Sequence, residues 1–416
     1  MENITAVILA AGEGTRMKTK LPKVLHKVGS MTMLGKVISN LKEAGVADIV
    51  VVVGYKAEQV EELFKGQVRF VRQTELLGSG DALIRAMGSL GETSGKVLVT
   101  CGDAPLIPSE TYRKMTREKE GVSCVVLTCE VPDPSAYGRI VRDAGGNVRN
   151  IAEEKDATRE EKEIREINVG TYCFLRGDLE RFLKEIKMNE KKREFYLTDI
   201  IGILTANGKK VASESCGIEE MIGINSRKDL ALASGIVNRK KLEELMVSGV
   251  TIVDPDTTRV DETASVGRDT VVFPFTVIEG DVMVGEGCKI GPFAHLRSGT
   301  TLADDVEIGN FVEVCRTEIG SGTRVKHHAY LGDAVIGKCV NIGAGAVTAN
   351  YDGRKKNSTV IGDNASIGAG AVLVAPVKVG RGATVGAGSV VTKMKDVADG
   401  ETVVGIPARS IYKSDT

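Results

Sequence analysis

The second half of this 416-residue chain repeats an aliphatic residue at every sixth position, and no other feature limits the possible fold so strongly. From residue 260 onward the first ten such positions are all aliphatic: Val260, Val266, Val272, Ile278, Val284, Ile290, Leu296, Leu302, Ile308 and Val314. After one-residue slips and one interruption the period continues to Val391 and gives 21 hexads. Three hexads per turn predict about seven coils of an all-β, left-handed parallel β-helix built from hexapeptide repeats.

Glycine and aromatic residues fit such a narrow coil. Glycine follows the aliphatic residue in several hexads, including residues 308–309 and 367–368, where we expect a corner without room for a Cβ atom. The whole chain holds 48 glycines, no Trp and only 9 Phe. A coil interior filled by Val, Ile and Leu has little room for large rings, so Tyr330 and Tyr351 become candidates for a binding site.

The first half of the chain alternates short apolar runs with amphipathic stretches. The apolar run over residues 5–10 leads into a glycine-rich turn over residues 11–14, and later runs end near residues 53, 71 and 100. Helical periodicity separates these runs. The alternation predicts an α/β, Rossmann-like domain with a mostly parallel sheet, whose ligand lies at the carboxyl ends of the strands.

Charged residues near the glycine turn favour a triphosphate ligand. The two glycines of the turn form only part of a dinucleotide fingerprint, so the turn alone is equally consistent with an ordinary tight turn. Arg16 and Lys23 flank it and can neutralise phosphates bound by its backbone amides. Asp103 follows the run over residues 97–100, where a carboxylate can hold Mg²⁺. The alternative role for Asp103 is the N-cap of a helix.

Charge and composition exclude several classes of function. The chain has 55 basic and 56 acidic residues, so no overall field draws it to nucleic acid or to an anionic membrane. Its start carries no basic segment before the first apolar run, and no apolar stretch approaches the ~20 residues of a membrane span. The eight cysteines are scattered without a CxxC pair. We therefore expect a cytoplasmic protein with reduced thiols.

Eight short motifs in the first half occur in the order found in a known enzyme family. They are LAAGEGTRM, LPKVLH, QTELLGSGDA, GDAPL, YGRI, EEKDAT, EINVG and GINSR. With these motifs, residues 1–225 resemble the nucleotidyltransferase half of bacterial N-acetylglucosamine-1-phosphate uridylyltransferase. The resemblance implies transfer of a uridylyl group from UTP to N-acetylglucosamine-1-phosphate, with Mg²⁺ as cofactor and pyrophosphate as the leaving group.

The same resemblance implies roles for individual residues. The nucleotide would contact Leu9, Ala10, Ala11, Gly12, Lys23, Gln73, Gly78, Ser79 and Asp103, with Gln73 and Gly78 at the uracil edge. Arg16 and Lys23 would act on the phosphates, and Asp103 and Asn225 would hold the metal. The acceptor sugar phosphate would contact Gly138, Glu153, Asn168 and Asn225. Cys101 and Asp81 depart from the family pattern, which bears on substrate preference.

The second half contains a predicted linker helix and two features that suggest more than a scaffold. Residues 229–247 have mostly helical spacing and predict a long connecting helix. The polar interruption over residues 349–357 predicts a loop expelled from the coil, and such loops often carry the binding face. His327 and His328 lie close by in sequence, and a histidine can take a proton from an amine that attacks a thioester. A rigid array that serves assembly alone is the alternative.

The motifs GNFVE, YLGDAVIG, NIGAGAVTANYDG and LVAPVKVG extend the resemblance into this half. They are similar to the glucosamine-1-phosphate acetyltransferase domain of the same bifunctional family. The resemblance implies acetyl-CoA as co-substrate, His327 as catalytic base, and a homotrimer whose neighbouring subunits build each site. The sugar phosphate would contact Arg297, Tyr330, Asn341, Tyr351 and Lys356. Acetyl-CoA would contact Ala344, Asn350, Tyr351, Ala369, Ala387 and Arg409.

Two positions of the second half depart from that family. Cys315 lies where the family carries a phosphate-binding Lys, and Ala369 lies where a Ser is expected. Arg316 is the neighbour that could substitute for the missing Lys, but adjacent residues of a strand point to opposite sides. Uridylyl transfer is therefore the firmer of the two implied activities.

The sequence leaves three readings of function. The leading one is a bifunctional enzyme that makes UDP-N-acetylglucosamine, with a nucleotidyltransferase domain over residues 1–225, a linker helix over 226–250 and an acetyltransferase β-helix over 251–416. The alternative is a uridylyltransferase whose β-helix serves trimerisation only. A zinc hydratase that uses His295, His327 and His328 is disfavoured, because the adjacent histidines should point to opposite faces of a strand.

Overall fold

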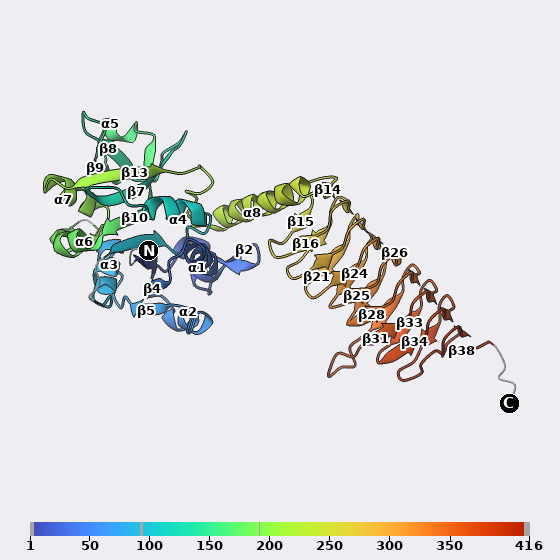
Figure 1. Ribbon diagram of the computed structural model, residues 1–416. Coiled ribbons are helices and arrows are strands. Elements are labelled where there is room, and N and C mark those ends of the chain that lie inside the picture. The colour runs from blue at the N-terminus through green and yellow to red at the C-terminus, as the bar shows by residue number, and fades with distance from the viewer. Residues whose placement is uncertain (1–3, 92–94, 191, 412–416) are drawn as a thin grey trace. The chain divides into compact units, whose positions relative to one another are not determined.

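The chain forms two compact units, one ending at Ser234 and the other beginning at Gly235. The computed structural model describes residues 4–91, 95–190 and 192–411 (Figure 1). The boundary between the units falls within one helix, α8 (Arg227–Val247).

A twisted, mixed sheet forms the centre of the first unit (Figure 1). Along the sheet its strands are β13 (Lys210–Ser215), β7 (Val122–Glu130), β10 (Glu166–Leu175), β6 (Lys96–Cys101), β1 (Ile4–Ala10), β4 (Asp48–Val53) and β5 (Arg69–Arg72), while β8 (Arg139–Arg142) and β9 (Val148–Ala152) extend it beside β10. The pairs β1–β4, β1–β6, β4–β5 and β13–β7 are parallel, and β10 runs antiparallel to both of its long neighbours. The mostly parallel α/β sheet expected from the sequence is confirmed.

Helices and short elements connect these strands. The helices are α1 (Met33–Glu43), α2 (Ala57–Leu63), α3 (Ser79–Met87), α4 (Ser109–Thr116), α5 (Arg159–Lys162), α6 (Arg176–Phe182) and α7 (Asp199–Ala206). Short 3₁₀ turns are η1 (Thr15–Met17), η2 (Lys23–Leu25) and η3 (Leu183–Glu185), and the two small ribbons are β2 (Lys27–Val28) with β3 (Met31–Thr32) and β11 (Met188–Asn189) with β12 (Glu194–Phe195).

The central sheet buries side chains on both faces. In β1, Val7 belongs to one apolar cluster, whereas Ala6 and Ile8 belong to a second. In β4, Val50 and Val52 likewise alternate with their neighbours between the two clusters. Side chains alternate along a strand, so helices on both faces account for the nearly unbroken apolar runs read from the sequence.

The second unit is a β-helix built from three parallel sheets. The β14 sheet holds β14 (Thr251–Ile252), β17 (Val271–Val272), β20 (Lys289–Ile290), β23 (Glu307–Asn310), β26 (Arg324–His327), β29 (Asn341–Ile342), β32 (Ser366–Ile367), β35 (Thr384–Val385), β37 (Thr402–Val404) and the antiparallel β38 (Arg409–Ser410). The β15 sheet holds β15 (Arg259–Val260), β18 (Val277–Ile278), β21 (His295–Arg297), β24 (Glu313–Cys315), β27 (Tyr330–Gly332), β30 (Val347–Ala349), β33 (Val372–Val374) and β36 (Val390–Val391). The β16 sheet holds β16 (Ser265–Val266), β19 (Met283–Val284), β22 (Thr301–Leu302), β25 (Glu318–Ile319), β28 (Ala334–Ile336), β31 (Thr359–Ile361) and β34 (Val377–Val379).

Strand pairing follows the hexad period. Up to β36 the parallel partners are three strands apart in the chain, and most pairs are 18 residues apart, as for Val272 and Ile290. At the carboxyl end β35 pairs with β37, the second strand after it. The predicted count of seven coils is too low, because the β14 sheet stacks nine parallel strands within the described residues. The period runs on through the buried Val397 and Val403, and Ile252 adds one strand, β14, to the coil that holds the first two hexads. The pairing and the repeats fit the left-handed hexapeptide coil that the sequence predicts.

Glycine follows the aliphatic residue at these corners because successive coils approach closely. A Cβ atom on Gly309 would lie 2.0 Å from the carbonyl oxygen of Lys326 in the next coil. By contrast, residues with side chains fill the left-handed corners, among them Phe275 (φ 59°), Phe293 (φ 56°) and Phe311 (φ 57°). Their exposed rings stack at centroid distances of 4.8 and 5.1 Å, and His328 continues the column at 4.9 Å from Phe311.

Helix α8 closes the first coil of the β-helix. Leu242 and Leu245 belong to the same apolar core as the coil residues. Asn238 donates from Nδ2 to the carbonyl oxygen of Thr258 and accepts from the amide of Val260, so one side chain satisfies backbone groups at the coil's open end. None of the helices that the structure describes is long and apolar enough to cross a membrane.

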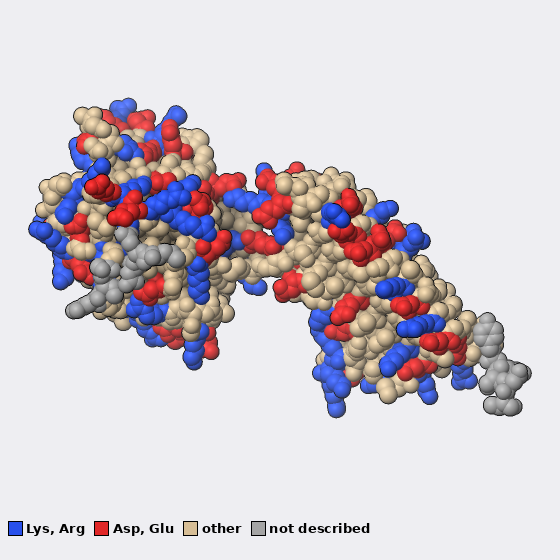
Figure 2. Space-filling view, viewed as in Figure 1, with Lys and Arg blue, Asp and Glu red and all other residues tan. Residues whose placement is uncertain are grey.

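Charges of both signs are interspersed on the face drawn in Figure 2, over both units. No broad single-sign area stands out on that face. Any anionic substrate must therefore be held by local groups of cations, as the net charge of −1 already suggested.

Candidate functional sites in both units

A pocket of about 370 Å³ lies at the carboxyl ends of β1 and β6 in the first unit. All nine residues predicted to contact a nucleotide line it: Leu9, Ala10, Ala11, Gly12, Lys23, Gln73, Gly78, Ser79 and Asp103. They come from four separate stretches of the sequence, and the parallel strands bring them to one edge of the sheet. Arg16 lies in η1 with an exposed side chain and is not among the lining residues.

Two glycines near this pocket occupy positions where a side chain does not fit. Gly14 has φ 66°, and a Cβ atom there would lie 2.7 Å from the Cβ of Lys23. Gly78 has φ 96°, and a Cβ atom there would lie 2.7 Å from the carbonyl oxygen of Phe195. Both positions combine a left-handed backbone with a close neighbour, so a residue with a side chain is strained in either place.

Gln73 is buried beneath the pocket with its amide group fixed. Its Nε2 donates to the carbonyl oxygen of Gly78 (3.0 Å) and to Oδ2 of Asp81 (2.8 Å). Asp81 is itself held by Arg85, whose Nε donates to the same carboxylate oxygen (2.7 Å). Because both hydrogens of Nε2 are engaged, Oε1 of Gln73 is the atom that remains to accept a hydrogen bond from a ligand.

Lys23, Asp103 and Asn225 meet at the mouth of the pocket. Lys23 Nζ forms an ion pair with Asp103 Oδ2 and donates to Asn225 Oδ1 at 3.1 Å. Two oxygen atoms therefore converge on one cation, although Asn225 is far from Lys23 in sequence. One carboxylate and one amide oxygen suit Mg²⁺, which takes few protein ligands and fills its shell with phosphate and water oxygens. The N-cap alternative for Asp103 is wrong, because α4 begins at Ser109 with Pro108 as its cap.

Three predicted acceptor residues lie at or next to strands β8, β9 and β10: Gly138 precedes β8, Glu153 follows β9 and Asn168 lies in β10. The amide of Asn168 donates to the carbonyl oxygen of Gly138 (2.8 Å), and Asn168 Nδ2 donates to the hydroxyl of Tyr172 (2.7 Å). Glu153 accepts from the hydroxyl of Thr198 at 2.8 Å. Burial raises the pKa of the Cys101 thiol, which lines the pocket, to about 12, so this thiol stays protonated.

In the β-helix, His327 ends strand β26 with a defined partner. Its Nδ1 lies 2.6 Å from Oδ1 of Asn310, which pairs with it in register on β23. An amide oxygen can only accept, so in the neutral ring this contact selects the tautomer with its hydrogen on Nδ1 and its lone pair on Nε2. His328 lies outside the strand in a left-handed corner (φ 46°), so the expectation that the two histidines alternate along one strand is wrong.

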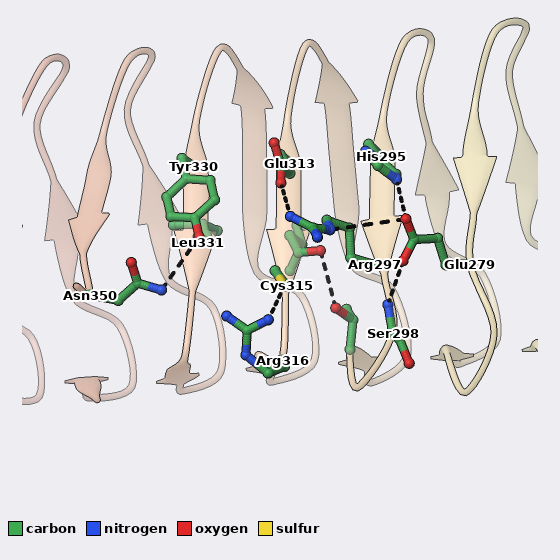
Figure 3. A network of polar contacts seen from close by, with 12 residues as sticks. Glu279, His295, Arg297, Ser298, Glu313, Cys315, Arg316, Tyr330, Leu331 and Asn350 are labelled. Atoms are coloured by element: carbon green, nitrogen blue, oxygen red, sulfur yellow. Dashed lines mark hydrogen bonds and ion pairs between the residues drawn. The ribbon is translucent and has the colours of Figure 1, made fainter. Parts of the chain in front are cut away.

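Several predicted acceptor residues of the second unit meet around Asp333. Asn350 donates from Nδ2 to Asp333. Figure 3 shows its second contact, from Nδ2 to the hydroxyl of Tyr330 (3.4 Å). The positive charge of Lys356 contributes to lowering the pKa of Asp333, after the larger effect of Arg316. Tyr351 is 64% exposed, on the loop that the interruption of the hexads predicts. Asn341 is exposed on β29, in register with Arg324 of β26.

Three alanines form a column on successive coils. The carbonyl oxygen of Ala344 accepts from the amide of Gly370, and that of Ala369 accepts from the amide of Gly388. Ala344, Ala369 and Ala387 are all exposed. Arg409 lies on β38, which pairs with β37 at the end of the same sheet.

Comparison with known proteins finds a matching protein family for each of the two units. A model of the MobA-like NTP transferase domain matches residues 6–166, and models of the bacterial transferase hexapeptide match residues 263–298, 283–316 and 358–393. The Bifunctional protein GlmU of Carboxydothermus hydrogenoformans is 43% identical over 411 residues, which is 90% of this chain and 92% of the relative. The chain belongs to the GlmU family. The GlmU proteins of Pelotomaculum thermopropionicum (45% over 414 residues, 90% of each chain) and Halalkalibacterium halodurans (41% over 417 residues, 92% of each chain) are similarly close.

Four further residues line the pocket of this GlmU-family chain although the sequence did not single them out as contacts, and only Glu194 lies outside the motifs quoted above. Val24, Leu76, Ala82 and Glu194 also line it. Glu194 arrives on β12, next to Phe195, whose backbone limits the space at Gly78. No spacing rule connects these positions, because tertiary packing alone brings them together. A larger cavity of about 800 Å³ lies between α7, β9 and β13 and contains no predicted site residue.

Proposed function

We propose that this chain makes UDP-N-acetylglucosamine in two steps. The β-helix transfers an acetyl group from acetyl-CoA to glucosamine-1-phosphate, and the first unit then joins the product to the uridylyl group of UTP. The observation that carries this proposal is the match to proteins described as bifunctional over about 90% of the chain, which includes both units. That description also favours two activities over a uridylyltransferase with an inert β-helix.

The first unit binds UTP with the base over Gln73. Uracil offers an N–H donor, and Gln73 Oε1 is the acceptor that its own hydrogen bonds leave available. The amides of the turn at Gly12 and the side chains of Lys23 and Arg16 hold the phosphates. Asp103 and Asn225 would hold Mg²⁺, which when bound neutralises charge that develops on the phosphates.

The transfer itself requires positioning rather than a covalent nucleophile of the protein. The acceptor sugar is held by Gly138, Glu153 and Asn168, with the hydroxyl of Thr198 orienting the Glu153 carboxylate. A phosphate oxygen of N-acetylglucosamine-1-phosphate attacks the α-phosphorus of UTP, and the bond to pyrophosphate breaks. The protonated Cys101 takes no part as a nucleophile, because its pKa lies near 12.

Acetyl transfer uses His327 as a general base. The amine of glucosamine-1-phosphate attacks the thioester carbonyl of acetyl-CoA while Nε2 of His327 takes the amine proton, and the proton then passes to the departing CoA sulfur. Asn310 holds the ring by its Nδ1 hydrogen, so the lone pair of the neutral ring is on Nε2, the atom that takes the amine proton. The acceptor contacts Arg297, Tyr330, Asn341, Tyr351 and Lys356, and CoA lies along Ala344, Ala369 and Ala387, with Asn350, Tyr351 and Arg409 beside it.

Assembly and location complete the proposal. We infer a cytoplasmic homotrimer formed through the β-helix, in which neighbouring subunits complete each acetyltransferase site. Hexapeptide repeats are compatible with such assembly. The match to proteins described as bifunctional over about 90% of the chain favours the two transferase activities over a hydratase with zinc bound between subunits.

Two substitutions test the assignment of one activity to each unit. His327→Ala should abolish release of CoA from acetyl-CoA with glucosamine-1-phosphate and leave UTP-dependent release of pyrophosphate unchanged. Asp103→Ala should do the reverse. Loss of both activities in either folded variant would contradict two separate sites, and wild-type protein that releases no CoA would leave uridylyl transfer as the only function.

A further inference from the structure

Arg316 occupies a position that the strand pattern did not predict. It follows β24 directly but has φ 48°, which makes it a left-handed corner residue and not the next residue of the strand. Its side chain therefore turns back over the strand instead of pointing to the opposite side. The Nη1 atom of Arg316 lies 2.7 Å from Sγ of Cys315, whose residue is only 2% exposed (Figure 3).

Asp333 holds the Arg316 guanidinium in this orientation. Nε donates to Oδ1 at 2.6 Å and Nη2 donates to Oδ2 at 2.8 Å, a two-point fork that fixes the plane of the group. Arg316 lowers the pKa of Asp333, and Asp333 raises the pKa of Arg316, so both stay charged near neutral pH. The two hydrogen bonds to Asp333 use Nε and Nη2, and the remaining nitrogen, Nη1, faces Cys315.

A second guanidinium lies on the other side of Cys315. Arg297 pairs in register with Cys315 on β21, and its Nη1 donates to Glu313 at 2.9 Å (Figure 3). Cys315 thus lies between Arg297 on the preceding coil and Arg316 at its own corner. Cys315 has a short side chain, whereas Arg297 and Arg316 each carry five N–H groups. Arg297 engages Glu313 and lies 4.0 Å from Glu279, and Arg316 engages Asp333 and Cys315, so each guanidinium keeps N–H groups for a ligand.

The acceptor residues surround this pair of cations. Tyr330 lies one coil beyond Glu313 in register, and Asn350 bonds both to Tyr330 and to Asp333. Two rigid guanidinium groups at one place on a sheet match the geometry of a phosphate monoester, whose oxygens accept paired N–H donors.

We propose that Arg316, positioned by Asp333, binds the phosphate of the acetyl acceptor together with Arg297. Arg316 thereby supplies the positive charge that Cys315 does not provide on this face. This inference rests on the proposed acetyltransferase function, and it adds the residue that selects the phosphorylated amino sugar over the free one.

The test compares binding and turnover of glucosamine-1-phosphate in the full-length protein. Calorimetric titration, with the nucleotide site saturated by UDP-N-acetylglucosamine, measures affinity, and CoA release measures KM and kcat. For Arg316→Ala we expect affinity to fall and KM to rise by roughly 10- to 100-fold, the range for loss of a hydrogen bond to a charged group. The KM for acetyl-CoA should stay unchanged, and the preference for glucosamine-1-phosphate over glucosamine should fall by a similar factor.

Two further variants separate a binding role from a structural one. Arg268→Ala removes an exposed arginine that pairs with Glu286 on an early coil and should leave all constants at wild-type values. Adding Cys315→Lys to Arg316→Ala returns a cation to the strand and should restore most of the lost affinity for the phosphorylated sugar.

Each outcome decides the proposal. Weak binding by Arg316→Ala that Cys315→Lys restores supports it. Unchanged affinity in Arg316→Ala, or a loss that Cys315→Lys cannot restore while folding stays normal, overturns it. If the wild-type protein binds glucosamine-1-phosphate in this way but releases no CoA, the proposed acetyl transfer fails while the role of Arg316 stands.

Discussion

At the residue scale, His26 links the segments that carry Lys23 and Asn225. Arg227 Nη1 donates to Nδ1 of His26 at 3.2 Å, so the ring hydrogen is on Nε2. Nε2 is buried, and no described group accepts a hydrogen bond from it. Burial, and after it the charge of Arg227, lowers the pKa of His26 below its usual 6.5. The neutral ring is therefore the form that the fold favours.

This environment predicts a pH-dependent stability of the first unit. Because the folded pKa is depressed, the contribution of His26 is present above pH 6.5 and is lost as the pH falls through that value toward the folded pKa. Urea unfolding at pH 7.5, 6.5 and 5.5 should show a falling free energy of unfolding, and His26→Gln should flatten the fall. An equally steep fall in the variant would assign the effect to other groups.

Single residues also show which positions the sequence predicts correctly and which it does not. The nine residues predicted to contact a nucleotide line one pocket because motifs at the ends of parallel strands meet at one edge of the sheet. Arg316 and His328 were misplaced for a common reason: each follows a strand directly but has a left-handed backbone. Alternation along a strand does not apply at a corner, and the sequence around these two residues carries no glycine or asparagine to signal one.

At the scale of elements, the coils of the β-helix tolerate no side chain where they approach most closely. Gly309→Ala places a Cβ atom 2.0 Å from the carbonyl oxygen of Lys326, a backbone atom that can move only if its coil moves. We expect the variant to lose about 1–3 kcal/mol of β-helix stability or more. The same shift disturbs the two successive coils that carry Asn310 and His327, so acetyl transfer should fall while uridylyl transfer persists.

A second glycine provides the control for this prediction. Gly235 lies in helix α8, and a Cβ atom there meets nothing within 4 Å. Gly235→Ala should leave stability unchanged or raise it by up to about 1 kcal/mol, because alanine favours helix more than glycine does. Chemical unfolding followed by circular dichroism measures both variants. Equal stability of Gly309→Ala and wild type would show that the coils can separate at little cost.

The elements themselves were largely predictable. Hexad spacing predicts the strands of the β-helix because every sixth side chain must enter one narrow core, and the core cluster indeed contains no aromatic residue. The predicted count of coils is too low because it ends at Val391, although Val397 and Val403 keep the period and belong to the core. Strand β10 could not be read as antiparallel, since a strand buried on both faces has the same composition in either direction.

At the scale of the whole molecule, each unit has apolar clusters of its own. The clusters of the first unit and the β-helix core share no residue. Ligands that bind one unit should therefore stabilise that unit alone, by about 2.7 kcal/mol at a concentration 100 times the Kd. In calorimetric melting, UTP with Mg²⁺ should raise one transition, and acetyl-CoA should raise the other.

The Asp103→Ala variant serves as control for this experiment. It should lose the shift caused by UTP and Mg²⁺ and keep the shift caused by acetyl-CoA. One transition that both ligands raise equally would mean that the units unfold as a single cooperative body, with helix α8, which spans their boundary, as the element that couples them.

The loop between β30 and β31 bears on how proteins of this shape can change over evolution. In the β15 sheet, 25 residues separate the paired Val347 and Val372, whereas 18 separate Val372 and Val390. The strands before and after the loop keep their pairing, so the extra residues project from the β-helix without shifting any other coil. Insertions and deletions can accumulate there while the rest of the repeat keeps its frame, and a lineage can remodel this rim of the acceptor site without rebuilding the rod that carries it.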